Sequence, residues 1–144
     1  MNARLFLVLP LLFAATAANA APAAFKPALS HKGECVAMVP GAWVPGFAGI
    51  GMKAPSGASN ILVSFKEGTI PSEKAGLKGV YTVTKTYEDS AARYWIEYKE
   101  GSGSVRHWYI VTPVGGNLCT AILDFDSALS ETDAKTVATS LKKH

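Results

Sequence analysis

The sequence predicts an α+β domain made mainly of antiparallel strands, with an amphipathic helix at the C-terminal end packed on the sheet. Two observations support this fold class. Four segments rich in valine, threonine, tyrosine, tryptophan and isoleucine follow one another in the C-terminal half, with only short turn clusters between them. After the last of them, apolar residues recur at helical spacing. The expected sheet contains this meander of four C-terminal strands and two or three N-terminal strands.

The meander is expected to be antiparallel throughout. Its strands cover residues 80–88, 92–100, 105–114 and 118–126, and its turns cover residues 89–90, 101–104 and 115–116. Parallel strands need a crossover of a dozen or more residues, and no segment of that length separates these strands. We therefore predict consecutive hairpins.

The C-terminal helix is expected to begin after Ser130, a preferred N-cap residue, with Asp133 three positions later in a capping-box-like arrangement. The apolar positions on one face of this helix are Ala134, Val137, Ala138 and Leu141. Lys142 and Lys143 follow, where positive charge favours the negative end of the helix. We predict a helix of about three turns that covers one face of the sheet.

The N-terminal half contains weaker signals. Alternation predicts a strand over residues 34–39, with Cys35, Ala37 and Val39 on one side, and another over residues 60–66. Residues 47–53 are expected to form an irregular strand, and residues 68–78 a loop with a single helical turn from Ser72. The middle of the chain is rich in glycine, and such loops often carry function on a rigid scaffold.

The first 20 residues have the features of a secretory signal peptide. A short segment with one cation precedes an apolar stretch, and small residues mark a cleavage site between Ala20 and Ala21. The apolar stretch is too short to span about 30 Å of hydrocarbon. We therefore expect a periplasmic or secreted protein. Residues 21–32 are expected to form a flexible leader rich in alanine and proline, and residues 33–144 a single globular domain.

The charge of the chain argues against partners that need a strong field. The 144 residues carry 14 basic and 11 acidic side chains. One basic residue, Arg4, lies in the signal peptide, so 13 basic side chains remain against 11 acidic ones, a formal charge of +2. Nucleic acid and anionic membrane surfaces attract dense positive charge. We expect no nucleic-acid partner and no insertion of the mature chain into a membrane.

Cys35 and Cys119 are the two cysteines, and both follow the signal peptide. An oxidising compartment favours a disulfide between them. Closing a loop of about 85 residues removes unfolded-chain entropy worth about 4 to 5 kcal/mol in the chain-entropy model. A catalytic CxxC pair or a metal-binding pair would need close spacing, which is absent. We predict a structural disulfide that joins the first strand to the last on the apolar side of the sheet.

Register arithmetic brings three polar side chains into one row. A two-residue turn at Ser102-Gly103 pairs Tyr98 with His107, and a turn at Gly115-Gly116 pairs His107 with Asp124. Neighbouring Cβ atoms in such a row lie about 5 Å apart.

The row has a structural and a functional interpretation. A polar row near the end of a sheet commonly satisfies itself by hydrogen bonds, and we favour this interpretation. It also suits ligand binding, pH sensing or, with His107 and Asp124 as weak catalytic candidates, a small hydrolase-type enzyme. A hard cation between Asp124 and Asp126 is a further alternative. The sequence contains no metalloprotease, serine-hydrolase, phosphate-loop or dinucleotide motif, so we expect no enzyme, no metal and no cofactor.

Aromatic residues concentrate in the meander, where all five tyrosines lie between Tyr81 and Tyr109. The expected core face carries Trp95, Trp108, Ile110, Cys119, Ala121, Leu123 and Phe125. The opposite face carries Tyr94, Tyr98, His107, Tyr109, Thr120 and Asp124. Tyr94, Tyr98, His107 and Tyr109 are our candidate binding residues, because tyrosine rings bury area at low entropy cost. The alternative is that a second layer from residues 33–78 covers this face.

Several short motifs together resemble a known group of proteins. They are Pro40, Gly41 and Trp43 after the first expected strand, Tyr94-Trp95 and Trp108-Tyr109 in the meander, Asp126 after the last strand, and Ser140-Leu141 in the helix. The chain from residue 33 onward is similar in these features to the PsbP/DcrB-like group of exported α/β/α sandwich proteins. The long helix that such domains often carry before the meander is not evident. The resemblance implies a binding or accessory role without chemistry, and it carries over no functional residue.

We therefore expect a non-catalytic exported binding or accessory protein. It would act on an envelope or periplasmic protein, or on a small ligand, through the tyrosine-rich face or the glycine-rich loops. An immunity or inhibitor protein that neutralises a toxin or hydrolase in the periplasm is the first alternative. The small enzyme using His107 and Asp124 is the second.

Overall fold

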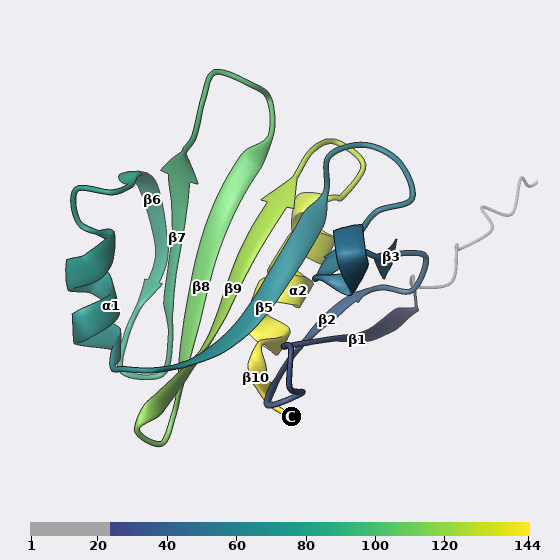
Figure 1. The fold of residues 1–144 in the computed structure, drawn as a ribbon. Coiled ribbons are helices and arrows are strands. Elements are labelled where there is room, and N and C mark those ends of the chain that lie inside the picture. Colours follow the sequence, from purple (N-terminus) through teal and green to yellow (C-terminus); the bar gives the residue numbers. More distant parts are fainter. Residues whose placement is uncertain (1–23) are drawn as a thin grey trace, which may run out of the picture.

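The computed structural model describes residues 24–144. The predicted signal peptide, its cleavage site between Ala20 and Ala21, and the first residues of the predicted leader lie outside the described residues. Within the described part, the chain forms two antiparallel sheets and two α-helices (Figure 1). The predicted α+β class, mainly antiparallel with a C-terminal helix packed on the sheet, is confirmed.

The larger sheet has seven strands and contains the predicted meander. In spatial order its strands are β3 (Val44–Pro45), β4 (Met52–Lys53), β5 (Asn60–Glu67), β9 (Asn117–Phe125), β8 (Arg106–Val114), β7 (Tyr94–Lys99) and β6 (Thr82–Asp89). Tyr98 pairs with His107, and His107 pairs with Asp124, as predicted. The predicted register of the meander is therefore confirmed. Gly115-Gly116 forms the predicted two-residue turn, whereas residues 100–105 form a longer loop than the turn predicted at Ser102-Gly103.

The smaller sheet places β2 (Cys35–Pro40) between β1 (Phe25–Leu29) and β10 (Lys142–Lys143). The prediction of a flexible leader over residues 21–32 is therefore wrong for β1, all of which pairs with β2. Ala28 of β1 is buried in the main core. In the turn between the strands, the hydroxyl of Ser30 accepts a hydrogen bond from the N–H of Cys35 at 3.0 Å. The alanine and proline content of this segment does not reveal a strand that depends on these contacts.

Residues 47–53 only partly match the predicted irregular strand. They form a 3₁₀ turn, η1 (Phe47–Gly49), followed by the two-residue strand β4. The chain then turns and enters β5.

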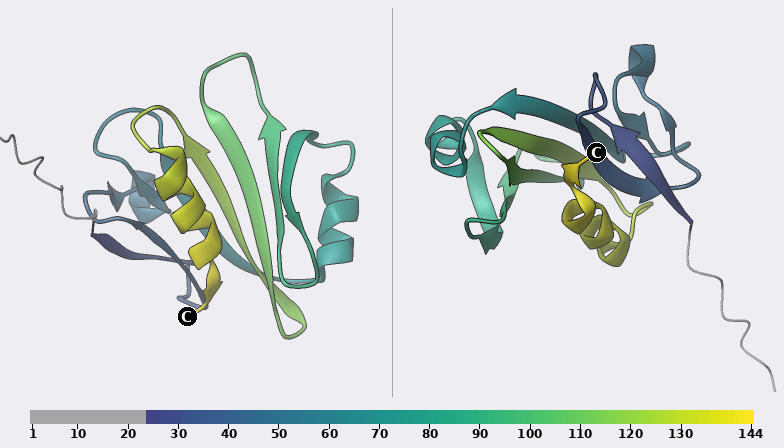
Figure 2. Two further views of the ribbon diagram at one scale, coloured as in Figure 1. Left: turned by 180° about the vertical axis from the view of Figure 1, so that it is seen from behind. Right: turned by 90° about the horizontal axis from the view of Figure 1, so that it is seen from below.

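The two α-helices lie on opposite faces of the larger sheet (Figure 2). α2 (Glu131–Ser140) is the predicted C-terminal helix, and the hydroxyl of Ser130 accepts a hydrogen bond from the N–H of Asp133 at 3.1 Å, as its N-cap role requires. α1 (Ile70–Leu77) is longer than the predicted single turn, and Thr69 and Ser72 form a capping box at its start. No helix among residues 24–144 is both long enough and apolar enough to cross a membrane.

The main core lies between the larger sheet, β2 and α2. Trp108, Leu123 and Leu141 are among its fully buried side chains. The predicted disulfide is present: Cys35 of β2 is bonded to Cys119 of β9, with their Cα atoms 5.6 Å apart. Because β1 precedes β2, the bond does not join the first strand to the last. It links the smaller sheet to the larger one inside the core.

Candidate binding surface

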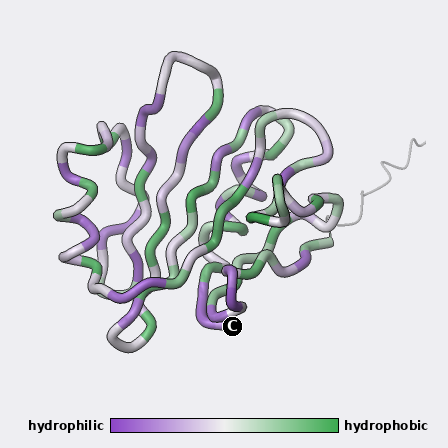
Figure 3. The backbone as a smooth tube through the Cα atoms, in the orientation of Figure 1, coloured by the Kyte–Doolittle hydropathy of each residue, from purple (hydrophilic) through white to green (hydrophobic). Residues whose placement is uncertain are grey.

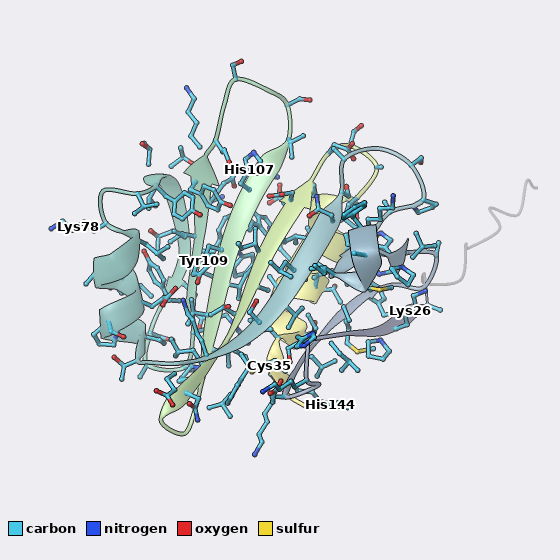
Figure 4. All side chains as sticks on the ribbon, viewed as in Figure 1. Lys26, Cys35, Lys78, His107, Tyr109 and His144 are labelled. Carbon is cyan, nitrogen blue, oxygen red and sulfur yellow. A yellow bond between two sulfur atoms is a disulfide. The ribbon has the colours of Figure 1, made fainter. Side chains whose placement is uncertain are left out.

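The predicted polar row is formed, and most of it is enclosed. His107 lies near the start of β8, close to the loop that joins β7 to β8 (Figure 4). Its Nδ1 atom lies 2.7 Å from Oδ1 of Asp124, and its ring centroid lies 5.5 Å from that of Tyr98. The His107 side chain is 14% exposed. The carboxylate thus orients an imidazole that is largely shielded, which fits the structural interpretation.

The described residues place neither a nucleophile beside His107 nor a set of metal ligands beside Asp124 and Asp126. No serine, threonine or cysteine in residues 24–144 is hydrogen-bonded to His107. No group of three or more metal-ligating side chains occurs in the same part of the chain. The carboxylates of Asp124 and Asp126 have different partners: Asp126 accepts hydrogen bonds from the N–H of Ala58 at 2.8 Å and from the hydroxyl of Ser59 at 3.0 Å. The backbone hydrogen bond from Ala58 lowers the pKa of Asp126. The Asp126 carboxylate therefore holds the loop at residues 58–59 in place.

The tyrosine-rich face is covered, which corrects the expectation of an open aromatic surface there. Tyr94, Tyr98 and Tyr109 are all buried, and they form a second apolar cluster with Ile70 of α1. The ring of Tyr81, in the segment after α1, lies 4.3 Å from that of Tyr98, centroid to centroid. This matches the alternative of a covering layer, which is made here by α1 and Tyr81.

A buried tyrosine hydroxyl helps to hold α1 on the sheet. Tyr109 donates a short hydrogen bond to the carboxylate of Glu73 on α1, and the ammonium group of Lys66 lies 2.5 Å from the same oxygen. Burial, with the neighbouring Glu73 carboxylate, raises the pKa of Tyr109 above its usual range. The phenol therefore stays protonated and acts as a donor to Glu73, which is a structural role.

Apolar side chains are exposed elsewhere, around the edge of the larger sheet formed by β5, at the end of β1 and in the loop between β3 and β4. We call this the apolar surface. It consists of Leu29, Phe47, Ile50, Leu62 and Phe65. Leu62 and Phe65 of β5 point to opposite faces of the sheet, on either side of this edge. These are five of the eight large hydrophobic side chains that are exposed in residues 24–144. Phe47 is 93% exposed, the highest value among them. Hydropathy colouring of the backbone shows hydrophobic positions in this loop, which stands away from the sheet (Figure 3).

Glycines fix the shape of the loop that presents Phe47. A Cβ atom on Gly46 would lie 2.1 Å from the carbonyl oxygen of Ile50, and one on Gly51 would lie 2.2 Å from that of Ile61. Gly51 also has a φ of +65°, in the left-handed region that favours glycine. No other residue fits either position without moving the backbone, so the exposure of Phe47 is built into the fold.

A groove of about 600 Å³ crosses the apolar surface. Its lining residues come from β1 and the following turn, from the β3–β4 loop and from β5: Pro27, Leu29, Ser30, His31, Gly33, Pro45, Gly49, Ile50, Gly51, Met52, Leu62, Val63, Ser64 and Phe65. This volume is typical of ligand-binding clefts. The glycines of this region are evident in the sequence but the groove is not, because the groove depends on β1 and on the short length of β4.

Comparison with solved structures identifies a protein with a similar fold. The chain resembles cyanobacterial PsbP (CyanoP) from Synechocystis sp. PCC 6803, whose structure was determined in solution, with a TM-score of 0.54 and 16% sequence identity. The match covers 90% of this chain and 98% of that one. No protein-family model and no curated protein matches the sequence. At this identity the likeness concerns the fold and not the function. The chain therefore has a PsbP-like fold, as the sequence motifs predicted.

Proposed function

We propose that this protein is a non-catalytic, exported accessory protein that binds another protein of the cell envelope through the apolar surface. The observation that carries the proposal is the exposure of Phe47, Ile50 and their apolar neighbours in a loop whose shape the glycines fix. Contiguous exposed apolar groups on a soluble protein mark interaction sites. The signal peptide expected from the sequence and the PsbP-like fold agree with this role.

A protein is a better partner for this surface than an enclosed small molecule. Small ligands bind in concave sites that bury most of their own surface. Phe47 instead protrudes, and a protruding aromatic side chain suits a pocket on a partner protein, where such residues often contribute most of the binding energy. The tyrosine-rich face offers no comparable surface, because α1 covers it.

Site-specific photo-crosslinking in the organism that encodes the protein tests the proposal. Benzoyl-phenylalanine is placed at Phe47 and, as a matched control, at Val80, which is 68% exposed and lies outside the apolar surface. We expect one discrete crosslinked adduct from position 47 and none from position 80. The absence of an adduct from position 47, or identical adducts from both positions, would contradict the proposal.

A further inference from the structure

One edge of β5 has no neighbouring strand over most of its length. β4 pairs only with Asn60 and Ile61, whereas β5 continues to Glu67. On this side, no strand of residues 24–144 pairs with residues 62–67 of β5. The other edge of β5 is fully paired with β9. An unpaired edge exposes backbone donors and acceptors that can pair with another chain.

The orientation of the backbone groups on this edge follows from one hydrogen bond. The N–H of Ala54 donates to the carbonyl oxygen of Ser59 at 2.9 Å, so the backbone of Ser59 faces the β4 side. Backbone groups in an antiparallel strand alternate between its two edges. The N–H and C=O groups of Val63 and Phe65 therefore face the same side, beyond the end of β4. No hydrogen bond within residues 24–144 occupies them on that edge.

The groove runs along this free edge. Four consecutive residues of β5, numbers 62–65, line it. Side chains of consecutive strand residues point to opposite faces, so one groove can contact all four only along the edge. Gly51, in its left-handed conformation, lies against Ile61 and Leu62 where the pairing of β4 with β5 ends. Pro27 and Leu29 of β1 form part of the lining. At a rise of about 3.3 Å per residue, the four lining residues of β5 extend over about 13 Å of this edge.

The surroundings of the groove carry positive charge. None of its lining residues is acidic. Lys32 and Lys53 adjoin lining residues in the sequence, and neither lies within ion-pair distance of a carboxylate of the described chain, although Lys32 attracts the nearby carboxylate of Glu34. Glu34 is the only acidic residue between positions 24 and 66, and its carboxylate accepts a hydrogen bond from Ser30 at 2.9 Å. Unpaired lysines beside apolar side chains suit a partner with acidic and apolar residues.

We infer that this groove binds an extended acidic and apolar peptide segment of the partner, which adds as a strand to the free edge of β5. The inference rests on the proposed function and deepens it by naming the chemistry of the partner. Backbone hydrogen bonds to Val63 and Phe65 supply affinity, and apolar side chains of the segment contact Leu29, Ile50 and Phe65. A second copy of this chain is a poorer occupant, because it would bring Lys32 and Lys53 against the same lysines.

Peptide titration of the purified mature protein tests the backbone pairing. The probe is a blocked seven-residue peptide of alternating glutamate and valine. The controls are the same peptide with N-methylated valines and a peptide of alternating lysine and valine. We expect the glutamate-valine peptide to slow amide hydrogen exchange at Val63 and Phe65. It should bind at least about tenfold more tightly than the methylated peptide, which lacks several backbone hydrogen bonds, and than the lysine-valine peptide, which has the wrong charge. Equal affinity for the methylated peptide overturns strand addition, and equal affinity for the lysine peptide overturns the acidic preference.

A pair of variants tests the same edge from the protein side. Proline is tolerated where the N–H faces outward from an edge, so Phe65→Pro removes only the free N–H, and Phe65→Ala controls for loss of the ring. We expect Phe65→Pro to bind the glutamate-valine peptide about tenfold more weakly than Phe65→Ala. Equal binding by two folded variants overturns the inference. If Phe65→Pro does not fold, the affinity of the wild-type protein for the methylated peptide, compared with the unmethylated one, decides whether the backbone pairing occurs.

Three further outcomes also decide against the inference. Vesicles of phosphatidylglycerol that bind the wild-type protein but not Phe47→Ser, when the peptide protects neither amide, would assign the surface to a membrane. Exchange protection at Val63 that rises with protein concentration alone would assign it to a second copy. A crosslink from position 47 without peptide protection would leave the proposed function standing and remove the strand addition.

Discussion

Glu97→Gln is expected to remove most of the pH dependence of stability that one partly buried charge network creates. Glu97 of β7 accepts hydrogen bonds from Arg106 at 2.8 and 3.0 Å, from the hydroxyl of Tyr87 at 2.7 Å and from the indole of Trp108 at 3.0 Å. The hydrogen bonds from Arg106 are the largest cause that lowers the pKa of Glu97 from 4.5 to about 2. The carboxylate is therefore more stable in the folded protein than in the unfolded chain.

The magnitude follows from linkage between ionisation and folding. A pKa lowered from 4.5 to about 2 corresponds to about 2 to 3 kcal/mol of stabilisation, the lower figure allowing for solvent screening at a side chain that is 19% exposed. Because the folded pKa is the lower one, this stabilisation is fully present above pH 4.5 and is lost as the pH falls towards 2. Glutamine cannot ionise, so the free energy of unfolding of the Glu97→Gln variant lacks this component.

Urea unfolding of both proteins at pH 7, 4 and 2.5 measures the effect. We expect Glu97→Gln to be less stable than the wild type by about 2 kcal/mol at pH 7, and the difference to shrink as the pH falls. The other carboxylates with lowered pKa values, including Asp126 and Glu131, are present in both proteins and largely cancel in the comparison. Two parallel stability curves from pH 7 to 2.5 would refute the reasoning.

Three further predictions concern the disulfide, the C-terminal helix and the exposed loop. Replacing Cys35 and Cys119 by alanine is expected to lower the free energy of unfolding by about 4 kcal/mol in the chain-entropy model, measured in urea; an unchanged midpoint would contradict that model here. Leu141→Asp places an unpaired charge in the core and is expected to cost about 2 kcal/mol or more; an unchanged melting temperature would show that the end of α2 is not docked. Phe47→Ser is expected to change stability by less than about 0.5 kcal/mol, and a larger loss would mean that Phe47 packs within the fold.

The parts of the fold that the sequence predicts are those set by local signals. The Gly115-Gly116 turn fixes the pairing of His107 with Asp124, and because strand register has a period of two, the same turn decides which side chains enter the core. Ser130 and Asp133 mark the start of α2 in the same local way. The strand β1 could not be predicted from local signals, because its position depends on pairing with β2 and on the burial of Ala28.

The candidate site was harder to predict, since both of its determinants are non-local. The tyrosine pattern on β7 and β8 suits an exposed binding face and a buried layer equally well, and only the position of α1 decides between them. A signal for α1 was present in the pair Thr69 and Ser72, which forms its capping box. The groove exists because β4 begins only at Met52, after Gly51 in its left-handed conformation, and so pairs with no residue of β5 beyond Ile61.

The arrangement of layers explains why apolar side chains stay exposed at this place in the fold. β2 and α2 cover one face of the larger sheet, and α1 covers the tyrosines on the other face, at the opposite side from β5 (Figure 2). α1 contacts β5 near its C-terminal end, where Lys66 pairs with Glu73, and on the β4 side β5 has no neighbouring strand from residue 62 onward. A free strand edge beside an uncovered apolar surface is a hazard for aggregation, and proteins usually block such edges with charge or with a covering segment. Here Leu62 and Phe65 remain partly exposed, and Lys32 and Lys53, which adjoin groove residues in the sequence, disfavour a second copy while leaving the edge open to an acidic partner.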